Sequence, residues 1–153
     1  MSLRSILAGA AAGAAGTTAL NAVSYLDVAV RARPASSTPE DTVEKLAEKV
    51  HVQIPGEGED RDNRLAGLGP LSGIVTGVGI GTLLGLARGL GWRPSPAVGA
   101  VVATVVVLIG ANGPMTALGI TDPREWNLDA WLSDVVPHVA YGVVTAATLD
   151  GLD

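Results

Sequence analysis

Long stretches without charge alternate with polar segments along this chain of 153 residues. Uncharged runs cover residues 5–26, 65–87 and 96–121, and a fourth apolar segment follows near the C-terminus. About 20 apolar residues in a helix are enough to cross the hydrocarbon core of a bilayer. The pattern predicts an all-α membrane protein, one membrane domain over residues 1–153 built as a four-transmembrane-helix bundle. The predicted spans are about 4–28, 66–90, 96–119 and 128–150.

The polar segment 31–64 lies between the first two predicted spans and contains a short helical pattern. Its apolar residues recur at the spacing of one helix face: Val43, Leu46, Ala47 and Val50. With Thr38 as N-cap and Pro39 in the first turn, a short amphipathic helix is predicted at about 39–51. It could lie on the bilayer or cover the end of the bundle. Because Glu and Lys mix on its polar side, packing on the bundle is favoured over an anionic-lipid anchor. The acidic run 57–62 is predicted to be a solvated linker.

Glycine recurs at every fourth position through the second predicted span. The six positions are Gly69, Gly73, Gly77, Gly81, Gly85 and Gly89. An interior glycine costs a soluble helix about 1 kcal/mol relative to alanine, whereas a bilayer enforces helix because backbone groups must be paired internally. A row without side chains lets another helix backbone approach closely. Since residues four apart are displaced by about 40° around a helix, the row winds, and two neighbours are expected to share it. These neighbours can belong to the same chain or to another subunit.

Polar side chains gather near the ends of three predicted spans, on the side of the long loop. Asp27 ends the first span, Asn112 lies near the end of the third, and Asp134 and His138 lie in the first turns of the fourth. Residues four apart share one helix face, and we expect this face to point into the bundle. Ionisable groups within a membrane mark functional sites by default. The candidate polar site therefore comprises Asp134, His138, Asn112, Asn21, Asp27 and Tyr141.

Each of these residues also has a structural interpretation. Asp27 lies four residues before Arg31 and can pair with it near the interface. Asp134 and His138 can form a local pair, and Asn112 can mark a helix terminus. A single clear histidine with a carboxylate is a weak signal for a metal site. No nucleophile–base constellation or nucleotide-binding motif is present, so no metal, cofactor or catalytic residue is predicted.

Composition and charge agree with a membrane location. Hydrophobic residues make up 48% of the chain, yet it contains no Phe, and the apolar content is mainly Ala, Gly, Val and Leu. The net charge of −5 does not indicate nucleic-acid binding. The absence of Cys excludes disulfides. Seven of the ten basic residues lie in the loops 31–64 and 121–126, so the positive-inside rule places these loops in the cytoplasm and both termini outside.

The sequence shows two resemblances to known proteins. The segment RPASSTPEDTVEKLAEKV at 33–50, with the glycine-rich span and PHVAYG at 137–142, resembles uncharacterised small integral membrane proteins of actinobacteria. The glycine row resembles the glycine zippers of some oligomeric membrane proteins and channels. The first resemblance implies a four-helix, multi-pass protein of the bacterial inner membrane, and it implies no activity or site.

Three classes of function compete on these observations. The favoured one is a structural or accessory subunit that binds copies of itself, or a larger membrane complex, through glycine-lined helix grooves. The alternative is a small oligomeric channel or transporter that uses the Asp134–His138 face. A membrane enzyme is the least favoured class because no reactive constellation stands out. The expected partners are the lipid bilayer and other membrane subunits, without nucleic acid.

Overall fold

The computed structural model describes residues 3–152, and this part of the chain contains helices and loops but no strand. The long helices are α1 (Leu3–Arg31), α3 (Glu59–Gly89), α4 (Pro96–Ala117) and α5 (Leu128–Leu152). A shorter helix, α2 (Thr38–Lys49), precedes α3, and a single 3-10 turn, η1 (Pro123–Glu125), precedes α5. All four long helices are long and apolar enough to cross a membrane. The all-helical prediction is confirmed, and the four apolar helices indicate a multi-pass membrane protein.

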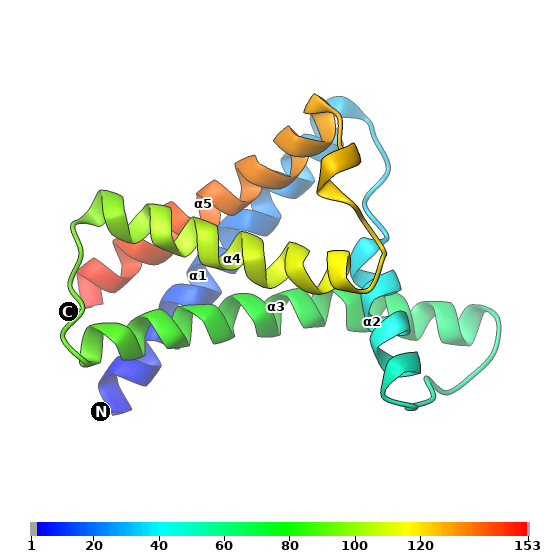
Figure 1. Ribbon diagram of the computed structural model, residues 1–153, viewed down its shortest axis with the longest axis horizontal. Helices are drawn as coiled ribbons and strands as arrows, with labels where there is room; N and C mark the ends of the chain where they lie inside the picture. Colours follow the sequence, from blue (N-terminus) through cyan, green and yellow to red (C-terminus); the bar gives the residue numbers. More distant parts are fainter. Residues whose placement is uncertain (1–2, 153) are drawn as a thin grey trace.

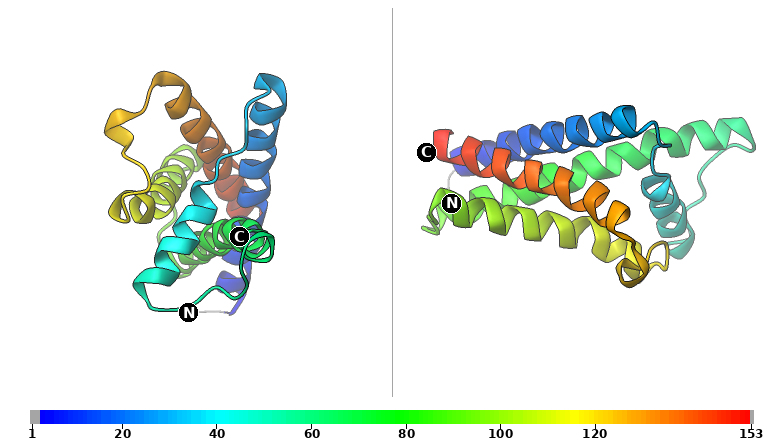
Figure 2. Two further views of the ribbon diagram at one scale, coloured as in Figure 1. Left: turned by 90° about the vertical axis from the view of Figure 1, so that its right-hand side faces the viewer. Right: turned by 90° about the horizontal axis from the view of Figure 1, so that it is seen from above.

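The four long helices form a bundle in which each one contacts two neighbours (Figures 1 and 2). Helix α1 packs between α3 and α5, and α4 closes the ring by contacting α5 and α3. Both ends of the chain lie at one end of the bundle, whereas α2 and the α4–α5 connection lie at the other (Figure 1). We call the first of these the terminal end and the second the loop end.

Most helix boundaries agree with the sequence analysis. Helices α1, α4 and α5 begin and end within three residues of the predicted spans. Helix α3 instead begins at Glu59, seven residues before the predicted start. The prediction of a linker over 57–62 is therefore wrong from Glu59 onwards. The reason is electrostatic: three acidic residues fill the first turn of α3, where the positive end of the helix dipole stabilises carboxylates.

Helix α2 differs in detail from the prediction. Its N-cap is Ser37 and not Thr38, and the Ser37 hydroxyl donates to the Asp41 carboxylate at 3.2 Å instead of capping a backbone N–H. The helix packs across α3. Along its apolar stripe, however, Leu46 and Val50 remain 51% and 58% exposed. Packing on the bundle thus covers only part of the stripe.

The core lies where all four long helices meet. Its buried apolar residues are Ala12, Ile80, Leu84, Ala103, Val107, Tyr141 and Leu149. The outward face of α4 is apolar and exposed at Val98, Val101, Val105 and Ile109. Exposed large apolar side chains that follow one face of a helix are unusual on a water-soluble monomer. They fit a helix whose outer side contacts lipid.

Candidate functional site

The predicted polar face of α5 points into the bundle. His138 is 9% exposed, and Tyr141 and Thr145 are completely buried. The side chain of Asp134, one turn before His138, is 19% exposed. The histidine therefore does not face lipid, as expected from the sequence.

Asp134 is the centre of a small polar cluster between α4 and α5. The amide of Asn112 donates to its carboxylate at 2.9 Å. Nδ1 of His138 lies 2.6 Å from the backbone oxygen of Asp134 and 3.6 Å from its carboxylate. A carbonyl oxygen only accepts hydrogen bonds, so Nδ1 carries a proton in this geometry. The imidazole N–H and the Asp134 carboxylate therefore lie on one polar face of α5 that turns towards α4.

Asp27 belongs to a second cluster, which joins the end of α1 to the first turns of α5. Its carboxylate accepts from Arg33 at 2.7 Å, from the Ser133 hydroxyl at 3.2 Å and from Arg31 at 3.4 Å. Arg31 also donates to Ser133 at 2.9 Å. The expected pairing of Asp27 with Arg31 is present, but Arg33 is the closer partner. This cluster adjoins the Asp134 cluster along α5. Within it, the Asp27 carboxylate is paired with both guanidinium groups.

Asn21 is half-buried in α1, apart from both clusters. Among residues 3–152, no hydrogen bond joins its side chain to Asp27, Asn112 or Asp134. Of the six candidate residues, the structure therefore brings Asn112, Asp134 and His138 together. Asp27, Asn21 and Tyr141 lie outside that cluster.

Tyr141 fills the centre of the bundle. Its hydroxyl donates to the backbone oxygen of Gly77 at 2.7 Å, across from α5 to α3. Its ring packs so closely that a Cβ at Gly77 would lie 3.3 Å from it and a Cβ at Gly16 only 2.9 Å. One turn further along α5, the Thr145 hydroxyl donates to the backbone oxygen of Ala12 at 3.5 Å. Fully buried side chains thus close the middle of the bundle.

Helix α1 covers the glycine row over most of its length. A Cβ at Gly9 would lie 2.5 Å from the backbone oxygen of Gly81, and a Cβ at Gly13 would lie 2.6 Å from that of Gly77. Gly85 meets the same stretch of α1 at Gly9. Real Cβ atoms do not approach neighbours so closely, so only glycine allows this backbone contact.

The loop end of the row has different neighbours. A Cβ at Gly69 would lie 2.9 Å from the backbone nitrogen of Glu40, so the first turn of α2 covers this position. No atom lies within 4 Å of where a Cβ of Gly73 would stand. Two elements of the same chain, α1 and α2, therefore share the row. The predicted packing role of Gly73 has no counterpart within this chain.

An ion pair at the terminal end of the bundle was missed by the sequence analysis. Arg88 at the end of α3 is only 6% exposed, and its guanidinium pairs with the carboxylate of Asp150 near the end of α5. No pairing of Arg88 was predicted from the sequence. A signal was present, because Arg88 follows Gly81 by seven residues and lies on the same helix face, which is the face that packs inward.

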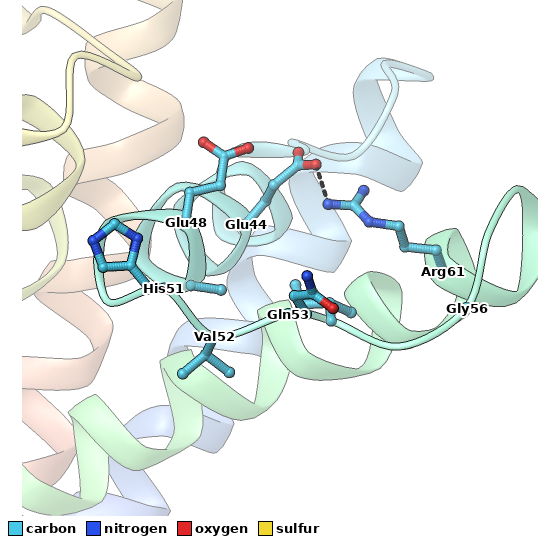
Figure 3. Close-up of a pocket in the computed structure, with 9 residues that line it drawn as sticks. Glu44, Glu48, His51, Val52, Gln53, Gly56 and Arg61 are labelled. Carbon is cyan, nitrogen blue, oxygen red and sulfur yellow. Dashed lines mark ion pairs between the residues drawn. The ribbon is translucent and has the colours of Figure 1, made fainter.

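An open groove lies outside the bundle, between the end of α2 and the start of α3. Its volume is about 540 Å³, and its lining includes Glu44, Glu48, His51 and Arg61 (Figure 3). Arg61 pairs with Glu44 at 2.5 Å. The groove is polar and exposed, and the Arg61 guanidinium in its lining is already paired with the Glu44 carboxylate.

The α4–α5 connection is also held by local polar contacts. The guanidinium and backbone N–H of Arg124 donate to Asp122 and hold the pKa of that carboxyl at about 2. Trp126 donates to the Thr121 hydroxyl at 2.7 Å and meets Trp131 edge to face. Tryptophans of this kind are frequent at membrane–water interfaces. The pair Asp122–Arg124 remains ionised near neutral pH.

Comparison with protein-family models, curated proteins and solved structures found no match. Within residues 3–152, no group of three or more His, Asp or Glu side chains is placed to hold a metal ion. The features that remain for a functional assignment are the glycine face of α3 and the Asp134 cluster.

Proposed function

We propose that the protein is a structural or accessory subunit of a membrane assembly. In this proposal it binds a second copy of itself, or a larger membrane complex, through the uncovered part of the glycine face of α3. The supporting observation is that α1 covers this face from Gly77 to Gly89, whereas Gly73 has no neighbour within 4 Å. A bare glycine in an apolar span lets the backbone of another helix settle against it.

The surroundings of Gly73 suit such a contact. Ala66 and Pro70 lie within about 60° of it around the helix, and both are exposed. Ile74, next along the chain, is 42% exposed. Small residues beside one branched side chain form a shallow surface into which a partner helix can fit. This surface continues the interface that α1 already makes with α3.

The closed centre of the bundle favours this function over conduction through one chain. Tyr141 and Thr145 are completely buried where α1, α3 and α5 meet. A solute or ion crossing between these helices would have to displace both side chains and break the bond from Tyr141 to Gly77. A binding role needs no such rearrangement.

Replacement of Gly73 by leucine tests the proposal. We expect Gly73→Leu to abolish the oligomer or the stoichiometric partner complex in mild detergent, because the new side chain fills the contact surface. The folded bundle should survive, since open space surrounds this position. Chemical cross-linking in native membranes and co-purification measure the association. Gly79→Leu is the matched control: Gly79 is also exposed in α3 with nothing within 4 Å, but it lies about 120° away around the helix. Equal association of both variants and the parent protein would refute the assignment.

The second candidate is a small oligomeric channel or transporter. The observation in its favour is the Asp134 cluster, in which Asn112 of α4 donates to the half-buried carboxylate of Asp134 and the buried imidazole of His138 lies one turn later on α5. Ionisable groups at such positions are costly in a membrane unless they serve a purpose. In this case the path would run along the surface of α4 and α5 within an oligomer, and not through Tyr141.

His138→Ala distinguishes a transport role from a structural one. If the protein conducts, we expect this variant to lose the pH-dependent part of ion flux in proteoliposomes, because it removes the imidazole from the Asp134 cluster. The thermal stability of the bundle should change little. Asn112→Ala is a useful companion, since it removes the bond to Asp134 without removing an ionisable group. Loss of stability without any change in flux would assign the cluster to packing alone.

We further propose a bacterial cell membrane as the location, with the loop end in the cytoplasm. The support for this orientation is the charge distribution: seven basic residues lie at the loop end, between the apolar parts of the long helices, and three lie at or near the terminal end. Basic loops are retained on the cytoplasmic side. Both termini then lie outside.

A further inference from the structure

Helix α2 lies across the bundle and not along it (Figures 1 and 2). Its first turn rests on α3 at Gly69, where the backbone nitrogen of Glu40 would be 2.9 Å from an added Cβ. Gly69 comes four residues after Leu65, the first residue of the uncharged part of α3. The start of α2 is therefore level with the place where α3 becomes apolar, which is the membrane–water boundary for this span.

The acidic side of α2 faces away from the membrane. Glu44 pairs with Arg61 at 2.5 Å (Figure 3), and Arg61 belongs to the charged part of α3 that precedes its apolar stretch. Glu48, one turn after Glu44, lines the same open groove. This side of α2 therefore looks towards the aqueous end of α3.

The apolar side of α2 consequently faces the membrane. Leu46 lies about 160° around the helix from both Glu44 and Glu48, and Val50 lies about 160° from Glu48. Leu46 is 51% exposed and Val50 is 58% exposed, so the described part of the chain leaves both largely uncovered. A helix with this division of faces, lying across a span at the boundary, matches an interfacial helix.

We propose that α2 is embedded in the boundary between lipid headgroups and acyl chains, with Leu46 and Val50 in contact with the chains. The occupant of this face is lipid because α2 crosses α3 at the level where α3 becomes apolar, and the face lies opposite the acidic residues that look towards the aqueous end of α3. Lys45 and Lys49 are exposed, about 100° from Leu46 and Val50 respectively. Their aliphatic stems can lie on the boundary while the ammonium groups reach headgroup phosphates. This anchor does not depend on the proposed subunit function.

Single-cysteine labelling can test the anchor, because the chain contains no other cysteine. Leu46→Cys, Val50→Cys and the control Glu48→Cys would each carry an environment-sensitive fluorophore. The proteins are reconstituted in vesicles of phosphatidylcholine and phosphatidylglycerol. Quenching is compared between lipids that carry a doxyl group near the top of the acyl chain and iodide in the water.

We expect the labels at 46 and 50 to be quenched severalfold more by the doxyl lipid than the label at 48, with the reverse order for iodide. Equal access of iodide to the labels at 46 and 48 would overturn the proposal. Protection of position 46 from both quenchers would also overturn it, because a second copy of the chain or another protein would then cover this face. Circular dichroism of each variant confirms that the helices are intact.

Discussion

Gly81→Leu is expected to unfold the bundle or to separate α1 from α3. Gly81 lies against Gly9 and Gly13 of α1 at backbone distance, and a Cβ there would meet the oxygen of Gly9 at 2.6 Å. The neighbouring atoms belong to the main chain, so they cannot turn aside as a flexible side chain would. Overpacking a core typically costs up to about 3 kcal/mol, and we expect this variant to reach at least that upper value. Size-exclusion chromatography and thermal unfolding in mild detergent measure the effect.

The control for this prediction is the neighbouring glycine on the outer side. Gly79 is exposed and has no atom within 4 Å of a Cβ, so Gly79→Leu should leave the unfolding temperature almost unchanged. Leucine also has the higher helix propensity of the two residues. If Gly81→Leu unfolds at the same temperature as the parent protein and as Gly79→Leu, the close contact of α1 with α3 does not hold the bundle together.

Asp150→Ala is expected to destabilise the terminal end of the bundle by about 3 kcal/mol. Removing one partner of a buried ion pair usually costs about 3–5 kcal/mol, because the remaining charge is left in a poor environment. Here only the Arg88 side chain is buried, at 7% exposed, whereas that of Asp150 is 32% exposed. Because it is the buried guanidinium that loses this carboxylate, we expect the lower end of the range. Thermal unfolding in detergent, followed by circular dichroism, measures the change.

A double variant separates the charge effect from simple loss of contact. In Arg88→Leu/Asp150→Leu, neither charge remains, and we expect most of the lost stability to return, as for other buried pairs replaced by apolar side chains. Asp129→Ala is the surface control: its side chain is 73% exposed and lies 3.6 Å from Arg31. Its removal should cost less than about 1 kcal/mol. A double variant as unstable as Asp150→Ala would contradict the role assigned to the pair.

The helices could be predicted well because span length and charge-free runs are properties of the sequence alone. Helix α5 begins at Leu128 and continues through Pro137, as predicted from length, because a helix that began at Pro137 would be too short to cross a bilayer. The start of α3 was missed because its first turns are acidic and resemble a linker. Their helical state depends on the axial dipole and on continuity with the apolar part, which hydropathy does not reveal.

The candidate polar site could be predicted in part. Helical spacing placed Asp134 and His138 on one inward face, and the span order brought Asn112 to the same end. The choice of partners depended on three-dimensional detail. Asp27 turns to Arg33, six residues later and beyond the end of α1, and Tyr141 crosses the bundle to a backbone oxygen. Backbone acceptors leave no signature in a sequence.

The position of α1 between α3 and α5 has a consequence for biosynthesis. Helix α1 is synthesised before both of its neighbours, α3 and α5, and α4 is made between these two. Its Ala- and Gly-rich surface offers lipid little apolar area, so α1 enters the bilayer as a weakly held segment. Helix α1 gains its close contacts with α3 only when Gly77–Gly85 have been made. It gains its contacts with α5 only when that helix of 25 residues has followed. The nascent chain must therefore be kept in the membrane, by the insertion machinery or by a lipid-bound α2, until α5 has been made.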